Sequence, residues 1–334
     1  MLVLGIESSC DECAVALVSD GPVLLSQMVA SQIPIHAPYG GVVPELASRD
    51  HIRNAIPVLD DVLKQAGVSL ERIDGIGVTA GPGLIGSLLV GVTMAKTLAF
   101  CLEKPLCGVN HLEAHLHAVY LEQPTFPYPY LGLVVSGGHT SVYRVEAVGR
   151  LKLLGRTLDD AAGEALDKVA KLLGLGYPGG VSIERTGSSG NRTAIRFPRP
   201  MHTRDTNFSF SGLKTAAVVR VKEQGMPSGQ RLNDFAASFQ EAVVDTLVRQ
   251  TIAAATREHL TRILVAGGVA ANSRLREEMT RRAEREGLSV TFPLVRLCTD
   301  NAAMVAALSH RYLSAGRDDG LSLDADAGLG WAHR

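Results

Sequence analysis

The chain has 334 residues, 46% hydrophobic and 20% charged, which is typical of a globular protein with one large or two medium domains. Its 33 basic and 34 acidic residues give a net charge of −1, so only a local patch could indicate a nucleic-acid partner. The five cysteines are scattered, which argues against a disulfide framework and for a reducing cytoplasm. No signal peptide is expected, and the apolar run 84–102, which contains Lys96, predicts a buried helix rather than a membrane span.

The first half opens with a three-strand meander and continues with alternating helices and strands. Its predicted strands are residues 3–7, 13–18, 23–29, 73–79 and 106–109. Helical periodicity over residues 50–67 places Ile52, Ile56, Leu59 and Leu63 on one face, which we expect to be buried. The Pro- and Gly-rich residues 31–50 predict a loop before that helix.

The second half repeats the same order. Its predicted strands are residues 130–136, 139–145, 151–156, 262–266 and 289–292, and its predicted helices are residues 161–173, 233–259, 270–286 and 299–315. We therefore expect a duplicated α/β fold with a cleft between its halves. The predicted divisions are an N-terminal lobe 1–129, a C-terminal lobe 130–315 with an insertion 174–230, and a tail 316–334.

Two histidines in the segment NHLEAH, residues 110–115, have the spacing of metal ligands. On a helix His111 and His115 lie on one face about one turn apart, where both imidazoles can reach one ion. A His-rich soluble helix without a metal is equally consistent with this spacing. The zinc-peptidase motif His-Glu-x-x-His does not fit, because Leu112 takes the place of its Glu and Glu113 points away from His111.

Two glycine pairs follow predicted strands, in VVSGGHT (134–140) and ILVAGGVAAN (263–272). Glycine pairs let backbone amides approach a phosphate, although an ordinary hairpin turn is the better explanation of the first pair taken alone. The second lies before a helix N-terminus, a common nucleotide position, but it is not the Gly-x-Gly-x-x-Gly fingerprint. Asp300 precedes the last predicted helix and could simply cap it.

Ten motifs that span almost the whole chain together resemble one protein family. They are GIESSCDE (5–12), GGVVPE (40–45), AGPGL (80–84), NHLEAH (110–115), VSGGHT (135–140), DAAGEALDK (160–168), YPGG (177–180), SFSGLK (209–214), GGVAAN (267–272) and CTDN (298–301). This ordered set resembles the TsaD family of tRNA N6-adenosine threonylcarbamoyltransferases, formerly described as O-sialoglycoprotein endopeptidases. That family belongs to the actin-like (ASKHA) superfamily, so the resemblance implies two actin-like lobes with a nucleotide cleft between them.

The resemblance also implies a reaction. A threonylcarbamoyl group moves from threonylcarbamoyl-AMP to N6 of adenosine-37 in tRNAs that read ANN codons, in t6A biosynthesis, with the help of one divalent metal ion. An ATP-dependent small-molecule kinase of the same superfamily is one alternative, but Glu7 and Ser136 stand where such kinases carry Asp for magnesium. A metallopeptidase is the other alternative. A non-enzymatic scaffold is disfavoured because degenerate paralogues lack the histidines that this chain has.

The resemblance assigns roles to particular residues. The implied metal ligands are His111, His115 and Asp300, a set that suits Fe2+ or else Zn2+. The histidines belong to the first half and Asp300 to the second, so the metal would tie the two lobes together. The implied catalytic carboxylates are Asp11 and Glu12. The implied substrate-binding residues are Val134, Val135, Ser136, Gly137, Gly138, Asp167, Gly180, Glu184 and Asn272.

The implied partners are tRNA, the paralogous subunit TsaB and the small P-loop ATPase TsaE, with no membrane and a cytoplasmic location. A local basic patch in the insertion is a candidate tRNA contact. It holds five arginines, namely Arg185, Arg192, Arg196, Arg199 and Arg204. A solvated loop whose arginines serve solubility is the alternative.

Overall fold

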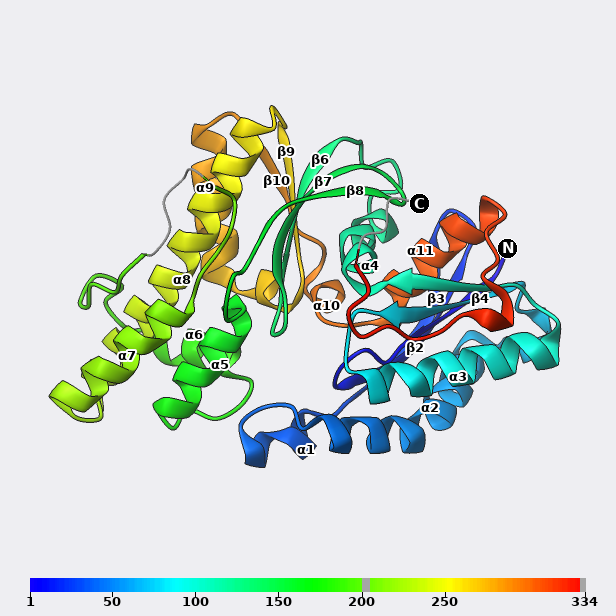
Figure 1. Ribbon diagram of the computed structural model, residues 1–334, viewed down its shortest axis with the longest axis horizontal. Coiled ribbons are helices and arrows are strands. Elements are labelled where there is room, and N and C mark those ends of the chain that lie inside the picture. The colour runs from blue at the N-terminus through cyan, green and yellow to red at the C-terminus, as the bar shows by residue number, and fades with distance from the viewer. Residues whose placement is uncertain (200–204, 331–334) are drawn as a thin grey trace. The chain divides into compact units, whose positions relative to one another are not determined.

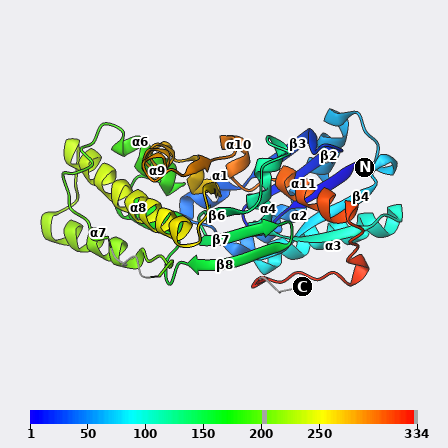
Figure 2. The same cartoon turned by 90° about the horizontal axis from the view of Figure 1, so that it is seen from above.

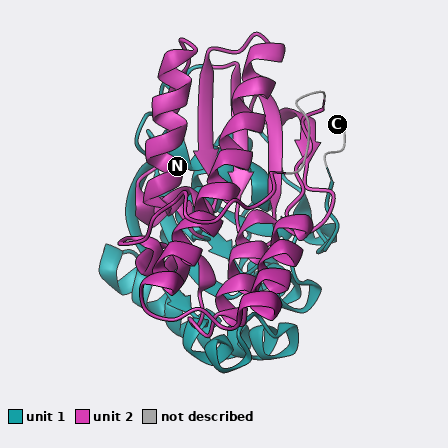
Figure 3. Ribbon diagram, turned by 90° about the vertical axis from the view of Figure 1, so that its left-hand side faces the viewer, with its two compact units in different colours: residues 1–127, 300–334 teal, residues 128–299 magenta. Residues whose placement is uncertain are grey.

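The computed structural model describes residues 1–199 and 205–330, which divide into two units by their internal contacts (Figures 1 and 3). Unit 1 is residues 1–127 and 300–334, and unit 2 is residues 128–299. The C-terminal boundary differs from the predicted one, because the chain returns to unit 1 at Asp300 rather than staying in the second lobe to residue 315.

Unit 1 contains one five-stranded sheet. Its strands are β1 (Val3–Glu7), β2 (Glu12–Ser19), β3 (Val23–Ser31), β4 (Gly75–Gly81) and β5 (Leu106–Asn110), in the order β3-β2-β1-β4-β5. The meander pairs are antiparallel, whereas β4 and β5 run parallel to β1. Its helices are α1 (Ile33–His36), α2 (Pro44–Ala66), α3 (Ile85–Leu102), α4 (His111–His117) and α11 (Ala302–Ser314), with short 3-10 turns at Ala37–Tyr39, Leu70–Arg72, Ala118–Leu121 and Gly320–Ser322.

Helices cover both faces of this sheet. Leu4 and Ile6 point into a core with α2 and α3, and the alternation along β1 turns Gly5 toward the opposite face. There α11 packs so closely that a Cβ on Gly5 would lie 2.6 Å from the carbonyl oxygen of Ala302. This tight contact, visible as α11 beside the strands in Figure 2, explains why the end of the chain belongs to unit 1.

The segment after α11 is fixed along β5. The backbone amide of Leu106 donates to Asp318 at 3.0 Å, and that of Gly108 donates to Asp319 at 2.9 Å. These side chains satisfy amides on the free edge of the sheet, which would otherwise be open to pairing with another strand. The described part of the predicted tail therefore packs on unit 1.

The buried face of α2 was partly mispredicted. Leu59 packs in the core, but the side chains of Ile52 and Ile56 are 66% and 62% exposed. The neighbouring α3 also exposes Ile85, Leu89 and Phe100. By length and composition alone α3 could cross a membrane; its other face, with Leu88, is buried inside unit 1. The two helices together thus carry an exposed apolar surface.

Unit 2 repeats the topology of unit 1. Its strands are β6 (Tyr130–Val135), β7 (Thr140–Ala147), β8 (Arg150–Arg156), β9 (Arg262–Ala266) and β10 (Ser289–Thr291), in the order β10-β9-β6-β7-β8. The pairs β6–β7 and β7–β8 are antiparallel, whereas the pairs β6–β9 and β9–β10 are parallel. Its helices are α5 (Ala162–Leu172), α6 (Gly179–Gly187), α7 (Ser211–Gln224), α8 (Gln230–Arg257), α9 (Ser273–Arg285) and α10 (Val295–Cys298), with a 3-10 turn at Gly268–Ala271. The predicted duplication is confirmed, and the predicted insertion 174–230 contains α6 and α7.

Candidate functional site

The capping of α4 sets the position of the two histidines. The side-chain oxygen of Asn110 accepts hydrogen bonds from the amides of Leu112, at 2.9 Å, and Glu113, at 3.3 Å. An N-cap of this kind starts the helix directly after Asn110. His111 and His115 then lie one turn apart, with ring centroids separated by 4.7 Å.

Asp300 completes a group of three candidate metal ligands. Its Oδ1 lies 3.1 Å from Nε2 of His115 and 3.6 Å from Nε2 of His111. One ligand atom from each of the three residues lies within 4.8 Å of the others. Asp300 is not the cap of α11, because Asn301 accepts the hydrogen bond from the amide of Met304 at 3.0 Å. All three residues belong to unit 1, so the expectation that Asp300 comes from the second lobe is wrong.

Glu7 holds the other side of His111. Its Oε2 lies 3.1 Å from Nδ1 of His111 and also accepts from the hydroxyl of Thr79 at 2.7 Å, while its Oε1 accepts from the amide of Ser9 at 2.6 Å. Burial raises the pKa of Glu7, but His111 and the hydrogen bond from Ser9 lower it by more. The pKa therefore lies below its ordinary value, and the carboxylate is ionised. Burial lowers the pKa of His111, yet Glu7 and Asp300 raise it to about 9.

The local sequence pattern does not reveal Glu7 as a partner of His111. The topology contains the missing signal: β1 ends at Glu7 and the parallel β5 ends at Asn110, so both ends lie at one edge of the sheet. Side chains at the carboxyl ends of parallel strands commonly form sites. Strand order was needed before this proximity could be recognised.

The donor set fits a divalent metal ion. Two imidazole nitrogens and one carboxylate oxygen are the ligands that Fe2+ and Zn2+ bind while leaving coordination positions open. In such sites a carboxylate commonly accepts a hydrogen bond from the remaining nitrogen of a ligating histidine, as Glu7 does for His111, and so fixes the orientation of the ring. The side chains of His111 and His115 are 5% and 0% exposed, so the ligands are held rigidly.

Two more carboxyl groups follow Glu7, with Asp11 in the turn between β1 and β2 and Glu12 at the start of β2. Burial raises the pKa of Asp11, and the negative charge of Asp300 raises it further. Burial raises the pKa of Glu12 to about 8, although a 2.9 Å hydrogen bond from the hydroxyl of Ser31 opposes this shift. The Oε2 atom of Glu12 is buried and has no hydrogen-bond partner among the described residues. Such a group can exchange a proton near neutral pH.

Glu113 is engaged away from the histidines. Its Oε2 accepts a hydrogen bond from the hydroxyl of Tyr312, on α11, at 2.8 Å. A metallopeptidase needs its glutamate beside the metal-bound water. The orientation of Glu113 therefore counts against that mechanism, as the sequence spacing predicted.

In unit 2, the predicted phosphate loop is the turn between β6 and β7, reached through Val134 and Val135 at the end of β6. Its ends are joined because the amide of Ser136 donates to the carbonyl of His139 at 2.8 Å, and the amide of His139 donates to the Ser136 hydroxyl at 3.1 Å. Gly137 and Gly138 are exposed, and an added Cβ on either would meet no atom within 4 Å. Packing within the protein therefore does not require glycine at either position. Because neither residue has a side chain, the backbone there is accessible to a ligand.

The remaining predicted substrate residues lie on α5, on α6 and at the start of α9. Asp167 on α5 accepts a hydrogen bond from the amide of Gly179 at 2.7 Å, which fixes the loop before Gly180. Glu184 on α6 accepts from the side-chain amide of Asn272 at 3.1 Å. The oxygen of Asn272 also caps α9, so this residue has a structural role whether or not it binds a ligand.

The arginines of the predicted basic patch have different surroundings. Arg199 pairs with Asp245 at 2.8 Å, and Arg192 lies 3.8 Å from Glu277. Arg185 and Arg196 are exposed, while Arg204 lies outside the described residues. The role of this patch in tRNA binding stays a prediction, carried mainly by its exposed members.

Comparison with known proteins gives a consistent result. The family model described as "TsaD: tRNA N6-adenosine threonylcarbamoyltransferase" matches residues 23–307. A protein of that name from Geobacter sulfurreducens is 56% identical over 326 residues, covering 97% of this chain and 96% of its own. A protein of the same name from Anaeromyxobacter dehalogenans is also 56% identical, and the match covers 97% of this chain and 98% of that protein.

Solved structures with similar folds are much more distant in sequence. HypF from T. kodakarensis gives a TM-score of 0.60 at 16% identity, covering 94% of this chain and 48% of its own. Component A of the (R)-2-hydroxyglutaryl-CoA dehydratase of Acidaminococcus fermentans gives 0.57 at 15% identity, covering 95% and 100%. At this identity the likeness shows the fold alone, an actin-like α/β architecture with two lobes.

Proposed function

The chain belongs to the tRNA N6-adenosine threonylcarbamoyltransferase family, and on this basis we propose that it takes the threonylcarbamoyl group from threonylcarbamoyl-AMP with the help of one divalent metal ion. The enzyme is a transferase that modifies N6 of adenosine in tRNA. Adenosine-37 of tRNAs that read ANN codons is the proposed target. The observation that carries the proposed metal dependence is the convergence of His111, His115 and Asp300.

The three side chains would hold the ion, with Fe2+ proposed ahead of Zn2+. When bound, the ion supplies a positive charge that polarises an oxygen of the donor and stabilises negative charge in the transition state. Glu7 supports this role because it fixes the ring of His111 and keeps Nε2 directed toward Asp300.

Asp11 and Glu12 are the proposed proton acceptors. The exocyclic amine of adenine forms a bond to the carbamoyl carbon, the bond from that carbon to the phosphate oxygen breaks, and AMP leaves with the electron pair. The amine loses a proton in this step, so a nearby base assists it. Burial raises the pKa of both carboxyl groups, which makes each a stronger base than a solvated carboxylate. Glu12 has in addition a carboxylate oxygen without a hydrogen-bond partner among the described residues.

The adenylate is proposed to bind the unit 2 residues. Backbone amides at Ser136, Gly137 and Gly138 are suited to a phosphate, because no Cβ of the two glycines obstructs them. Asp167, Gly180, Glu184 and Asn272 are the further proposed contacts, with Glu184 as a partner for the ribose. Val134 and Val135 lead into the loop from a buried strand.

Partners are proposed from the exposed surfaces and the family. The apolar side chains of Ile52, Ile56, Ile85, Leu89 and Phe100 on α2 and α3 are the proposed contact for the paralogous subunit TsaB. The ATPase TsaE is a further proposed partner, and the cytoplasm is the proposed location. Neither the kinase nor the metallopeptidase alternative is favoured by the relatives' names.

One experiment tests the metal dependence and the reaction together. Protein purified without added metal is analysed for bound metals, and its tRNA product is digested and assayed for the modified nucleoside. We expect about one Fe2+ or Zn2+ per chain in the wild type, and loss of both metal and product in the triple variant His111→Ala/His115→Ala/Asp300→Ala. His259→Asn, which removes an exposed histidine of unit 2, is the control. Full metal occupancy in the triple variant would show that the site is wrongly placed.

A further inference from the structure

A surface hollow of about 740 Å³ lies in unit 2 between the last turns of α8 and α9. Its charged lining consists of one glutamate, Glu286, and five arginines: Arg249, Arg257, Arg281, Arg282 and Arg285. The other lining residues are an isoleucine, an alanine and a threonine, so no aromatic ring faces the hollow. This combination is strongly basic and offers no surface for stacking a base.

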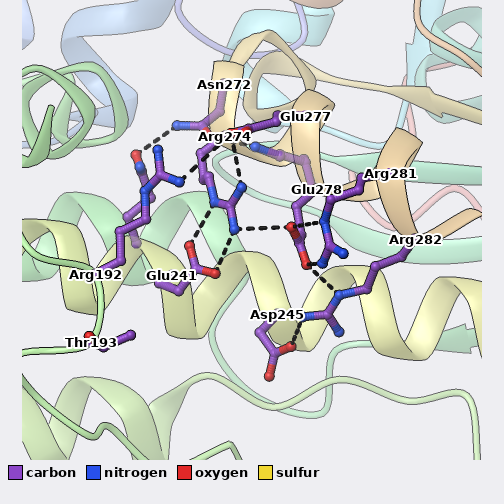
Figure 4. Close-up of polar contacts among 12 residues, drawn as sticks. Arg192, Thr193, Glu241, Asp245, Asn272, Arg274, Glu277, Glu278, Arg281 and Arg282 are labelled. Carbon is purple, nitrogen blue, oxygen red and sulfur yellow. Dashed lines mark hydrogen bonds and ion pairs between the residues drawn. The ribbon is translucent and has the colours of Figure 1, made fainter.

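Two carboxylates, the buried Glu278 and the partly buried Asp245, hold two of these arginines in place (Figure 4). Glu278, whose side chain is 2% exposed, accepts from Arg281 through both carboxylate oxygens, at 2.5 and 3.0 Å. It also accepts from Nε of Arg282, whose Nη2 donates to Asp245 at 2.5 Å. Side chains fixed in this way lose less conformational entropy when a ligand binds.

The lining of the hollow is strongly basic, because it carries five arginines and a single glutamate, Glu286. Glu278 and Asp245 hold Arg281 and Arg282 from behind. The Nη1 groups of Arg281 and Arg282 are not used in the hydrogen bonds described above, and a guanidinium offers five donors. Arg285 is exposed and makes no hydrogen bond or ion pair with the described residues. Donors for an anion are therefore available.

Helix stability alone does not explain this arrangement. α8 ends at Arg257 and α9 ends at Arg285, and cations are favourable at helix C-termini. That effect fades within the last turn, whereas Arg249 lies two turns before the end of α8. The two helices instead present their arginines to one shared hollow.

We propose that this arginine hollow binds backbone phosphates of the tRNA substrate, away from the adenosine that is modified. The inference rests on the proposed function, because that function supplies the RNA. Guanidinium groups bind phosphate oxygens through paired hydrogen bonds, and a site without aromatic rings reads the backbone rather than the bases. It should therefore contribute to binding of every tRNA, independently of sequence.

The test is tRNA binding by the wild type and by Arg257→Gln/Arg285→Gln, measured with the partner subunits between low and moderate salt. The matched control is Arg150→Gln/Arg156→Gln, which removes the same charge from exposed positions on β8. For two lost phosphate contacts, the log–log salt slope should become shallower by roughly 1.5. Affinity at low salt should fall roughly tenfold or more, whereas the control should change little.

Further measurements separate the sources of the anion. Cognate and non-cognate tRNAs should lose affinity equally, and binding of an adenylate analogue should stay unchanged. At equal ionic strength, inorganic phosphate should compete with tRNA binding no better than chloride does. If phosphate competes better with the wild type and this preference is lost in the variant, the hollow binds free phosphate instead. Binding of the partner subunits should also be unaffected, and its loss in the variant would assign the hollow to an acidic protein surface.

Two outcomes distinguish this inference from the proposed function. If the wild type binds and modifies tRNA but the double variant keeps the same salt slope, the inference fails while the proposed function stands. If the wild type neither binds nor modifies tRNA, both fail. Circular dichroism and thermal melting of the variant check that the exposed substitutions leave the fold intact.

Discussion

The turn after the first strand differs in chemistry between the two units, although their sheets share one topology. In unit 1 the turn from β1 to β2 follows Glu7 and carries Asp11, and its site is built from side chains. In unit 2 the equivalent turn, from β6 to β7, carries Gly137 and Gly138, and it presents backbone. The fifth strand of unit 1 leads into α4 with its histidines, whereas β10 leads into the short α10. The duplicated scaffold thus supports two kinds of site, because function resides in connections rather than strands.

Buried carboxylates also have different partners in the two units. Glu7 in unit 1 lies against a candidate metal ligand, while Glu278 in unit 2 is surrounded by Arg274, Arg281 and Arg282. We infer that Glu7 contributes mainly to metal binding, whereas Glu278 contributes to stability as well as to the placement of Arg281 and Arg282.

Glu278→Gln should lower the free energy of unfolding by about 3 kcal/mol, because it removes the charge that compensates three guanidinium groups. Bound metal should be unchanged, since the site lies in unit 1. Urea denaturation and metal analysis measure the two effects. Glu277→Gln, in a more exposed ion pair of the same helix, should cost less than 1 kcal/mol.

The effect of Glu278 should depend on pH. Burial raises the pKa of Glu278, but the hydrogen bonds from Arg281 and Arg282 lower it by more, so that its pKa is about 2. Because the folded pKa lies below the ordinary value of 4.5, the stabilisation is complete above that value and is lost as pH falls toward 2. The stability difference between wild type and Glu278→Gln should therefore shrink between pH 5 and pH 3; a constant difference would contradict this origin.

Glu7→Gln should weaken metal binding by roughly 10- to 100-fold, because the amide supports His111 less well than the carboxylate does. Glu113→Gln is the matched control, since it changes another buried acid near the histidines that instead bonds to Tyr312. Metal titration of both variants measures the effect. Equal metal affinity in the two variants would show that the contact of Glu7 with His111 does not support metal binding.

Gly137→Val should weaken binding of a non-hydrolysable adenylate analogue by roughly tenfold, through steric obstruction of the phosphate rather than misfolding. An added Cβ at this position meets no protein atom within 4 Å, so the fold should tolerate it. Ser136→Ala should have a milder effect. Calorimetry can measure all three proteins, and wild-type affinity in Gly137→Val would exclude the phosphate role.

Arg192→Gln/Arg196→Gln should make the log–log salt slope of tRNA binding shallower by at most about 1.5, and by less if Arg192 stays beside Glu277 and only Arg196 contacts a phosphate. Arg199 is kept because its ion pair with Asp245 is structural. Adenylate binding should not change. An unaltered salt slope would place the tRNA on other surfaces, including the arginine hollow.

The sequence by itself determined the repeated meander, the two glycine turns and the spacing of His111 and His115. These features depend on local periodicity and turn chemistry, which neighbouring residues specify. The same local logic mispredicted the buried face of α2, because Ile52 and Ile56 are as apolar as a core side chain and only packing distinguishes them.

The tertiary structure decided which distant groups meet. Asp300 reaches the histidines because α11 packs against Gly5 of β1, and Glu7 reaches His111 because β1 and β5 are parallel strands ending at one edge. The arginine hollow likewise arises only where α8 and α9 lie side by side. Such contacts join residues up to about 300 positions apart, such as Gly5 and Ala302, and no local pattern encodes them.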